Sequence, residues 1–170
     1  GMGSFRRAGL FAAAEKRCMK LHVIGENEGD REATADVALL FGYLKNADKN
    51  EFIVQKAVEL GVKKIVAFSS EYSSAYMNEN KLERLNKVSR EAAKQCLRSV
   101  APRVIYCGDF QSALKEADGY ENKLFACEFA KDSEAELSTL KGGCALIVGS
   151  EGGFSEKEAA LAKENGFSSI

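Results

Sequence analysis

The chain has 170 residues, of which 45% are hydrophobic and 29% charged, which suits one folded domain or one domain with a fragment of another. Its net charge of −1 excludes a polycationic chain, so any contact with nucleic acid must use a local basic patch. No apolar run approaches the roughly 18 residues of a membrane span, and no signal-peptide pattern is present, so we expect a soluble cytoplasmic protein.

The five cysteines indicate reduced thiols. They form no C-x-x-C pair, and several lie inside apolar runs, as the core thiols of cytosolic proteins do. His22 is the single histidine, so neither a metal-ligand spacing nor a Ser/His/Asp arrangement can be assembled. Because His22 lies in an alternating strand pattern, we expect a structural role for it.

The first part of the chain carries weak signals and the rest carries strong ones. Residues 1–4 are excluded from fold reasoning, residues 18–24 alternate as a strand, and residues 25–30 have the composition of a polar turn. Further strands are predicted at residues 37–41, 64–68, 103–107, 123–129 and 144–148, with the start of another at 167–170. Helices are predicted at residues 50–60, 79–100, 110–117, 133–140 and 156–165.

Strands that alternate with helices at this spacing indicate βαβ units. The sequence therefore predicts an α/β fold with a mainly parallel sheet and helices on both faces. Gly61 suits a left-handed cap after the first of these helices, and Pro102, the only proline, is expected to stop the second.

The helix predicted at residues 79–100 combines an apolar stripe with a cationic one. The cations recur at steps of three and four residues: Lys81, Arg84, Lys87, Arg90, Lys94 and Arg98. Such a row could follow a phosphate backbone, although a solvated surface helix explains the same pattern. Gln95 and Arg98, near the end of the helix, could instead point into a site.

A glycine-rich turn links the apolar run at residues 144–148 to the last predicted helix. Gly149, Gly152 and Gly153 permit backbone angles or a close approach that a side chain would block. Ser155 with Glu158 three residues later is a capping box, which predicts a helix start. A strand, a glycine turn and a helix in this order predict a ligand site at the carboxyl end of the sheet.

The composition of this turn restricts its ligand. It lacks the G-x-x-x-x-G-K-S/T pattern of a P-loop and the G-x-G-x-x-G pattern of a dinucleotide-binding domain. Glu151 inside the turn makes an anionic phosphate a poor guest. S-adenosylmethionine, which carries cationic groups and an adenine, suits it better, although the pattern could also be only a tight connection between strand and helix.

Three segments of the chain resemble one protein family. The sequence L-I-V-G-S-E-G-G-F-S at residues 146–155 is similar to the G-P-E-G-G-F-S signature of the ribosomal RNA small subunit methyltransferase E family, in the SPOUT superfamily of trefoil-knotted methyltransferases. The stretch from Lys45 to Val62 resembles the family's K-x-D…QKxxELGV segment, and residues 91–99 with Pro102 resemble its E-A-A-x-Q-x-x-R-x-x-x-P segment. The resemblance covers about residues 36–170.

The resemblance implies a function and a set of site residues. It implies methylation of N3 of a uridine in small-subunit ribosomal RNA, by a homodimer that holds S-adenosylmethionine within the knot and uses no metal. The positions that match the family's cofactor site are Gly149, Ser150, Glu151, Gly152, Gly153, Cys127 and Glu128. The positions expected to contact RNA are Arg84, Lys87, Lys94, Gln95 and Arg98. No general base is identified; Glu151 and Arg98 are the candidates.

The chain also departs from the family pattern. Ser150 replaces the usual proline of the signature, Tyr72 stands where the family often has arginine, and Val100 replaces a frequent basic residue. The family continues past a stretch like residues 166–170 into L-G-x-R-I-L-R-x-E-T-A, which closes the knot. We therefore expect residues 1–170 alone to bind the cofactor weakly or not at all.

The expected organisation has two parts, and the function has two rivals. Residues 1–35 are expected to be a remnant, such as the end of a PUA-like RNA-binding barrel, and residues 36–170 a SPOUT methyltransferase domain without its closing C-terminal segment. One alternative is a non-catalytic module that binds RNA or the ribosome on the same fold. The other is an unrelated nucleotide-binding α/β domain, which would prefer phosphates to a sulfonium.

Overall fold

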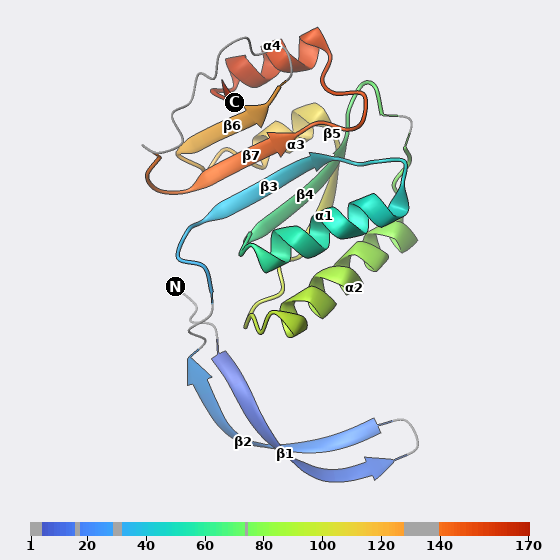
Figure 1. Ribbon diagram of the computed structural model, residues 1–170, viewed down its shortest axis with the longest axis vertical. Helices are drawn as coiled ribbons and strands as arrows, with labels where there is room; N and C mark the ends of the chain where they lie inside the picture. The colour runs from blue at the N-terminus through green and yellow to red at the C-terminus, as the bar shows by residue number, and fades with distance from the viewer. Residues whose placement is uncertain (1–4, 16–17, 29–31, 74, 128–139) are drawn as a thin grey trace.

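A computed structural model of the chain describes residues 5–15, 18–28, 32–73, 75–127 and 140–170 (Figure 1). The strands are β1 Phe5–Glu15, β2 Cys18–Glu28, β3 Val37–Gly42, β4 Lys64–Ser69, β5 Val104–Asp109, β6 Asn122–Ala126, β7 Cys144–Val148 and β8 Ser168–Ser169. The helices are α1 Ala47–Glu59, α2 Glu79–Gln95, α3 Phe110–Lys115 and α4 Glu156–Glu164. None of the helices in these ranges is long and apolar enough to cross a bilayer.

Six strands form one parallel sheet in the order β5-β4-β3-β7-β6-β8. The central strands are apolar along their whole length because both of their faces are covered, as parallel strands require. All six strands run in the same direction, so the carboxyl ends of β3, β4, β6 and β7 meet at one edge of the sheet. The predicted α/β fold with a mainly parallel sheet is confirmed.

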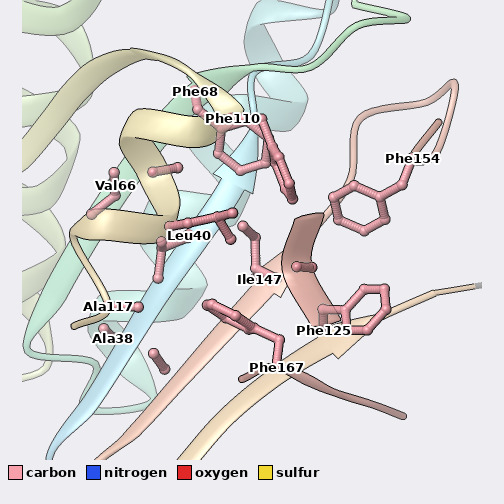
Figure 2. Packing of buried hydrophobic residues seen from close by; sticks show 14 of the residues in the cluster. Ala38, Leu40, Val66, Phe68, Phe110, Ala117, Phe125, Ile147, Phe154 and Phe167 are labelled. Atoms are coloured by element: carbon pink, nitrogen blue, oxygen red, sulfur yellow. The ribbon is translucent and has the colours of Figure 1, made fainter. Parts of the chain in front are cut away.

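The helices cover both faces of the sheet, and each face has its own core. The core on one side contains α1 and α2, with Val54 and Leu85 among its buried residues. The core on the other side contains α3 and α4 and includes an aromatic cluster (Figure 2). There the ring of Phe154 lies 5.5 Å from that of Phe110 and 6.0 Å from that of Phe125, centroid to centroid. Phe154 follows the glycine turn directly, so its burial anchors that turn.

Two predicted helix boundaries are corrected. The helix α1 begins at Ala47, not at residue 50, because the side chain of Asn46 caps it by accepting from the amides of residues 48 and 49. The helix α2 ends at Gln95, well before Pro102. Leu97 takes a left-handed conformation with φ of 61°, and the Arg98 amide donates to the carbonyl oxygen of Ala93, which completes a Schellman cap.

The N-terminal strands β1 and β2 form a separate two-stranded antiparallel sheet. The predicted strand at residues 18–24 is confirmed, but residues 25–28 continue it and do not form the expected turn. His22 lies in β2, opposite Leu10 of β1. Most of the predicted helix at residues 133–140 lies outside the described residues. Four of the cysteines, at positions 96, 107, 127 and 144, carry free thiols, in agreement with the sequence.

Candidate functional site

The glycine turn, residues 149–153, connects β7 to α4 at the carboxyl edge of the sheet. It closes on itself through the Gly153 amide, which donates to the carbonyl oxygen of Ser150 at 2.9 Å. Gly153 has a φ of 68°, a conformation that strongly favours glycine. The predicted capping box is present, since the Ser155 hydroxyl accepts from the Glu158 amide and the Glu158 carboxylate accepts from the Ser155 amide. The turn thus leads directly into an ordered helix start.

The ends of β3 and β4 hold the turn from the side. At Gly42, the last residue of β3, an added Cβ would lie 2.5 Å from the amide nitrogen of Ser150, so a side chain is excluded there. The Ser70 hydroxyl, just after β4, lies 2.8 Å from the Ser150 hydroxyl. The ends of β3 and β4, together with the end of β7 from which the turn continues, therefore fix the position of the loop.

Glu158 ties a second loop to the same place. Its side chain is buried, and its second carboxylate oxygen accepts from the amide of Glu71, in the loop after β4, at 2.9 Å. Tyr72 follows, and a Cβ added at Gly152 would lie 2.8 Å from the Tyr72 Cβ. The loop after β4 is thus packed against the glycine turn, through one buried carboxylate and one close contact.

The end of β6 forms the other neighbour of the turn. In the register of β6 and β7, Ala126 pairs with Val148, so Cys127 and Gly149 follow adjacent strand ends. Cys127 is buried, whereas Val148 is 36% exposed. Glu128, the next predicted cofactor residue, lies outside the described residues. Beside the turn, the structure thus places one buried thiol and one exposed apolar side chain.

This lining suits a cationic, partly apolar ligand better than a metal or a phosphate. Glu151 is exposed and is the acidic residue of the turn. Within the described ranges, no group of three histidine, cysteine or acidic side chains could hold a metal ion. Backbone polar groups, a nearby carboxylate and apolar surface match the sulfonium, amino and adenine groups of S-adenosylmethionine. The residues present therefore fit the cofactor that the sequence suggests.

The structure does not bring Gln95 and Arg98 to this loop, which corrects the expectation that they point into the site. Because α2 runs back along the sheet, both residues lie at the opposite, amino edge. The Arg98 side chain is 5% exposed, and it donates to Glu32 and to the carbonyl oxygens of Val58 and Val62. Its guanidinium holds the segment before β3 against the ends of two helices, which is a structural role.

The six cations at positions 81–98, five of them on α2, do not form one row either. Steps of three residues turn about 300° around a helix, so each cation lags the previous one by about 60° and the row winds away. Lys81 donates to the carbonyl oxygen of Tyr76, and Arg84 pairs with Glu51 on α1 at 2.5 Å. Lys87, Arg90 and Lys94 remain on the exposed side of the helix.

Sequence reasoning missed the residues that hold the glycine turn in place. Gly42, Ser70 and Glu71 gave no local signal, because their role depends on which strands are neighbours in the sheet. The sequence predicts Glu158 as half of a capping box, but it does not predict the hydrogen bond from the Glu71 amide to the second carboxylate oxygen. A list of the residues that end each parallel strand would have included Gly42 and Ser70.

Comparisons with known proteins find related sequences. A family model described as RNA methyltransferase domain matches residues 31–170. The chain is 31% identical over 154 residues to ribosomal RNA small subunit methyltransferase E of Mesomycoplasma hyopneumoniae (strain 232), with 89% of this chain and 67% of the relative covered. It is 32% identical over 153 residues to the protein of that name from Bacillus subtilis (strain 168), with coverages of 83% and 58%. The chain thus spans about three fifths to two thirds of these relatives.

Solved structures share the fold. Ribosomal RNA small subunit methyltransferase E from Neisseria gonorrhoeae, bound to S-adenosyl methionine, has a TM-score of 0.84 at 23% identity and covers 99% of this chain and 70% of its own. A probable rRNA-methyltransferase from Porphyromonas gingivalis has a TM-score of 0.84 at 21% identity, with coverages of 100% and 72%. At these identities the likeness concerns the fold.

Proposed function

The chain belongs to the RNA methyltransferase domain family, and within it to the ribosomal RNA small subunit methyltransferase E family, and we propose from this that it methylates N3 of a uridine in small-subunit ribosomal RNA, with S-adenosylmethionine as the methyl donor. The observation that carries the proposal is the glycine turn, held at the carboxyl edge of the sheet by three strand ends and by Glu158. This is the place where open α/β sheets bind ligands.

We assign the cofactor to Gly149, Ser150, Glu151, Gly152 and Gly153, with Cys127, which follows the adjacent strand β6, and with Glu128, the next residue in the sequence. When bound, S-adenosylmethionine supplies an electrophilic methyl group. The backbone of the turn would hold it in one orientation, and the packing of the loop after β4 on Gly152 would limit access of water. Positioning and desolvation then supply much of the rate.

The uridine must lose its N3 proton to become a nucleophile. Glu151 is the exposed carboxylate of the turn and is our candidate for holding that proton or for attracting the cationic cofactor. The variant Glu151→Gln separates the two roles. A lower rate at unchanged cofactor affinity supports proton transfer, whereas weaker cofactor binding at an unchanged maximal rate supports attraction.

Several finer features follow from the family resemblance. We propose that the protein acts as a homodimer in the cytoplasm, without a metal, and that residues 36–170 belong to a SPOUT trefoil-knot domain. The β1–β2 sheet then belongs to a PUA-like RNA-binding barrel. Ribosomal RNA is the partner, and the cations of α2 that remain exposed, with Arg84, are the proposed contacts.

Two measurements test this function. Isothermal titration calorimetry of the whole protein with S-adenosylmethionine measures cofactor binding. Mass spectrometry of nucleosides from unmethylated small-subunit ribosomal RNA, incubated with the protein and cofactor, should show N3-methyluridine. If the whole protein binds this RNA but does not bind S-adenosylmethionine, the proposed enzymatic function is refuted and the non-catalytic RNA-binding module is favoured.

A further inference from the structure

A groove lies between α2 and the segment that leads into β5, at the open edge of the sheet. Its volume is about 900 Å³. Its cations come from two walls: Arg84, Lys87 and Arg90 from α2, and Arg103 from the segment before β5. Glu79 and Glu83 are the acidic residues that line it. In a chain whose net charge is −1, four cations against two carboxylates make this a locally basic surface.

The two walls of the groove are tied together by side chains of α2. The Asn86 amide group donates to the carbonyl oxygen of Val104 at 2.9 Å, and its oxygen accepts from the Val104 amide at 3.0 Å. The Ser89 hydroxyl donates to the carbonyl oxygen of Pro102 at 2.5 Å. These bonds fix the spacing of the two backbone segments that carry the cations, so a ligand has to order only their side chains.

Most of the groove cations are available to a ligand. Arg90 and Arg103 form no ion pair with any residue in the described ranges. Lys87 is 3.9 Å from Glu91, and both side chains are more than 60% exposed, so that pair is weak. Arg84 alone has a close partner, Glu51. The groove therefore offers guanidinium and ammonium groups to an anion.

Two exposed tyrosines belong to the chain segment that leads from beside the glycine turn to the start of α2. The loop after β4 runs from Tyr72, beside Gly152, to the start of α2 at the mouth of the groove. Tyr72 is 59% exposed and Tyr76 is 75% exposed. Lys81 donates to the carbonyl oxygen of Tyr76 at 2.5 Å, which ties this part of the loop to α2. Exposed aromatic rings are what unpaired bases stack on.

We propose that this groove holds the backbone of a single-stranded RNA segment, whose bases stack on Tyr76 and Tyr72 on the way to the glycine turn. The inference rests on the proposed function and deepens it by giving the substrate a path. N3 of uridine lies on the Watson–Crick edge and is covered in a duplex, so the reacting uridine must be unpaired, which a single strand satisfies without flipping a base. The exposed ring of Tyr72, beside Gly152, is a surface on which a base near the glycine turn can stack.

Fluorescence anisotropy tests the path with a fluorescein-labelled 12-nucleotide RNA of mixed sequence, single-stranded or annealed to its complement. In the double variant Arg90→Glu/Arg103→Glu we expect at least tenfold weaker binding of the single strand. Losing two phosphate contacts should also flatten the plot of log affinity against log salt by about 1.4, at roughly 0.7 per phosphate of a single strand. The matched control Lys115→Glu/Lys141→Glu makes the same charge change at exposed positions outside the groove and should bind within twofold of the parent.

The tyrosines should respond differently. In Tyr72→Ala/Tyr76→Ala we expect binding to weaken about tenfold or more, since stacking on each base contributes substantially, while the salt dependence stays unchanged. The proposal is overturned if the groove variant binds like the parent, or if the duplex binds as tightly as the single strand. Calorimetry of Arg90→Glu/Arg103→Glu with S-adenosylmethionine distinguishes the proposed RNA path from the proposed function. If this variant binds both the cofactor and RNA like the parent, the RNA path is refuted and the proposed function is not. Circular dichroism melting shows that each variant is folded.

Discussion

Replacing Glu158 with glutamine removes the buried carboxylate that joins the start of α4 to the loop after β4. One carboxylate oxygen accepts from the Ser155 amide and the other from the Glu71 amide, each at 2.9 Å. Glutamine has the same shape, but its amide group can accept only one of these bonds and must face the other N–H with an N–H of its own. The lost bond is to a charged group in a buried place and costs about 1.5–3 kcal/mol. The lost charge at the helix N-terminus adds about 0.3–1 kcal/mol.

The matched control is Glu156→Gln, the same chemical change in the first turn of the same helix at an exposed position. It loses only the interaction with the helix dipole, so we expect less than about 1 kcal/mol. Urea unfolding followed by circular dichroism should then separate the variants by roughly 2 kcal/mol, or about 4–8 °C in melting temperature.

The same pair of variants tests the coupling to the site. Releasing the loop after β4 should weaken binding of S-adenosylmethionine at least tenfold in Glu158→Gln, measured by calorimetry on the whole protein. In Glu156→Gln the affinity should stay within twofold of the parent. Equal stability of the two variants would refute the reasoning, because the two hydrogen bonds of the buried carboxylate would then contribute nothing to the free energy of unfolding.

Three further changes have definite expected outcomes. In Gly42→Ala the new methyl group would overlap the backbone of Ser150, so we expect a loss of about 1–3 kcal/mol in urea unfolding. Burial raises the pKa of Glu32, but hydrogen bonds from Arg98 and two backbone amides outweigh it, so the pKa lies below its ordinary value. Its stabilisation is therefore present above the ordinary carboxyl pKa and is lost as pH falls through the lowered one, and Glu32→Gln should flatten the acid limb of a stability–pH curve. In Asn86→Ala the edge strand loses both of its bonds to α2, and we expect about 2–3 kcal/mol of destabilisation by the same unfolding assay.

Matched control variants test whether the destabilisation of Gly42→Ala and Asn86→Ala comes from the contacts described. Gly119→Ala adds a methyl group where nothing lies within 4 Å, and Asn80→Ala makes the Asn86 substitution at an exposed position of the same helix. Both should change stability by less than about 0.5 kcal/mol. The packing arguments fail if a site variant and its control unfold alike. An unchanged acid limb in Glu32→Gln would contradict the assigned role of its carboxylate.

The strands of the parallel sheet and the start of α4 could be predicted from the sequence because their signals are local. The run at residues 144–148 is apolar throughout, and such a run is typical of a strand that is covered on both faces. The capping box of Ser155 and Glu158 spans only four residues, so its pattern and its geometry coincide. The glycine turn could be placed for the same reason.

The function of Arg98 could not be predicted, because its partners are distant in the chain. Periodicity assigned it to a cationic face of a helix that was expected to continue to residue 100. The helix stops at Gln95, and the left-handed Leu97 turns Arg98 inward to Glu32, 66 positions earlier. A leucine carries no cap signal, whereas Gly61 in the corresponding position of α1 does. The end of the helix and the direction of the Arg98 side chain therefore depend on the same left-handed residue, which local sequence does not reveal.

Ser150 shows how a departure from a family pattern can be compensated in the fold. Proline at this position would restrict the turn through its fixed φ, so serine is expected to loosen it. In the structure the Ser150 hydroxyl bonds to the hydroxyl of Ser70, 80 positions earlier, and the amide of Ser150 lies against the backbone of Gly42. A tertiary hydrogen bond and a close backbone contact thus supply the restriction that the ring would give. The serine therefore makes the turn depend on the ends of β3 and β4, so a change in either strand end should reach the proposed cofactor site directly.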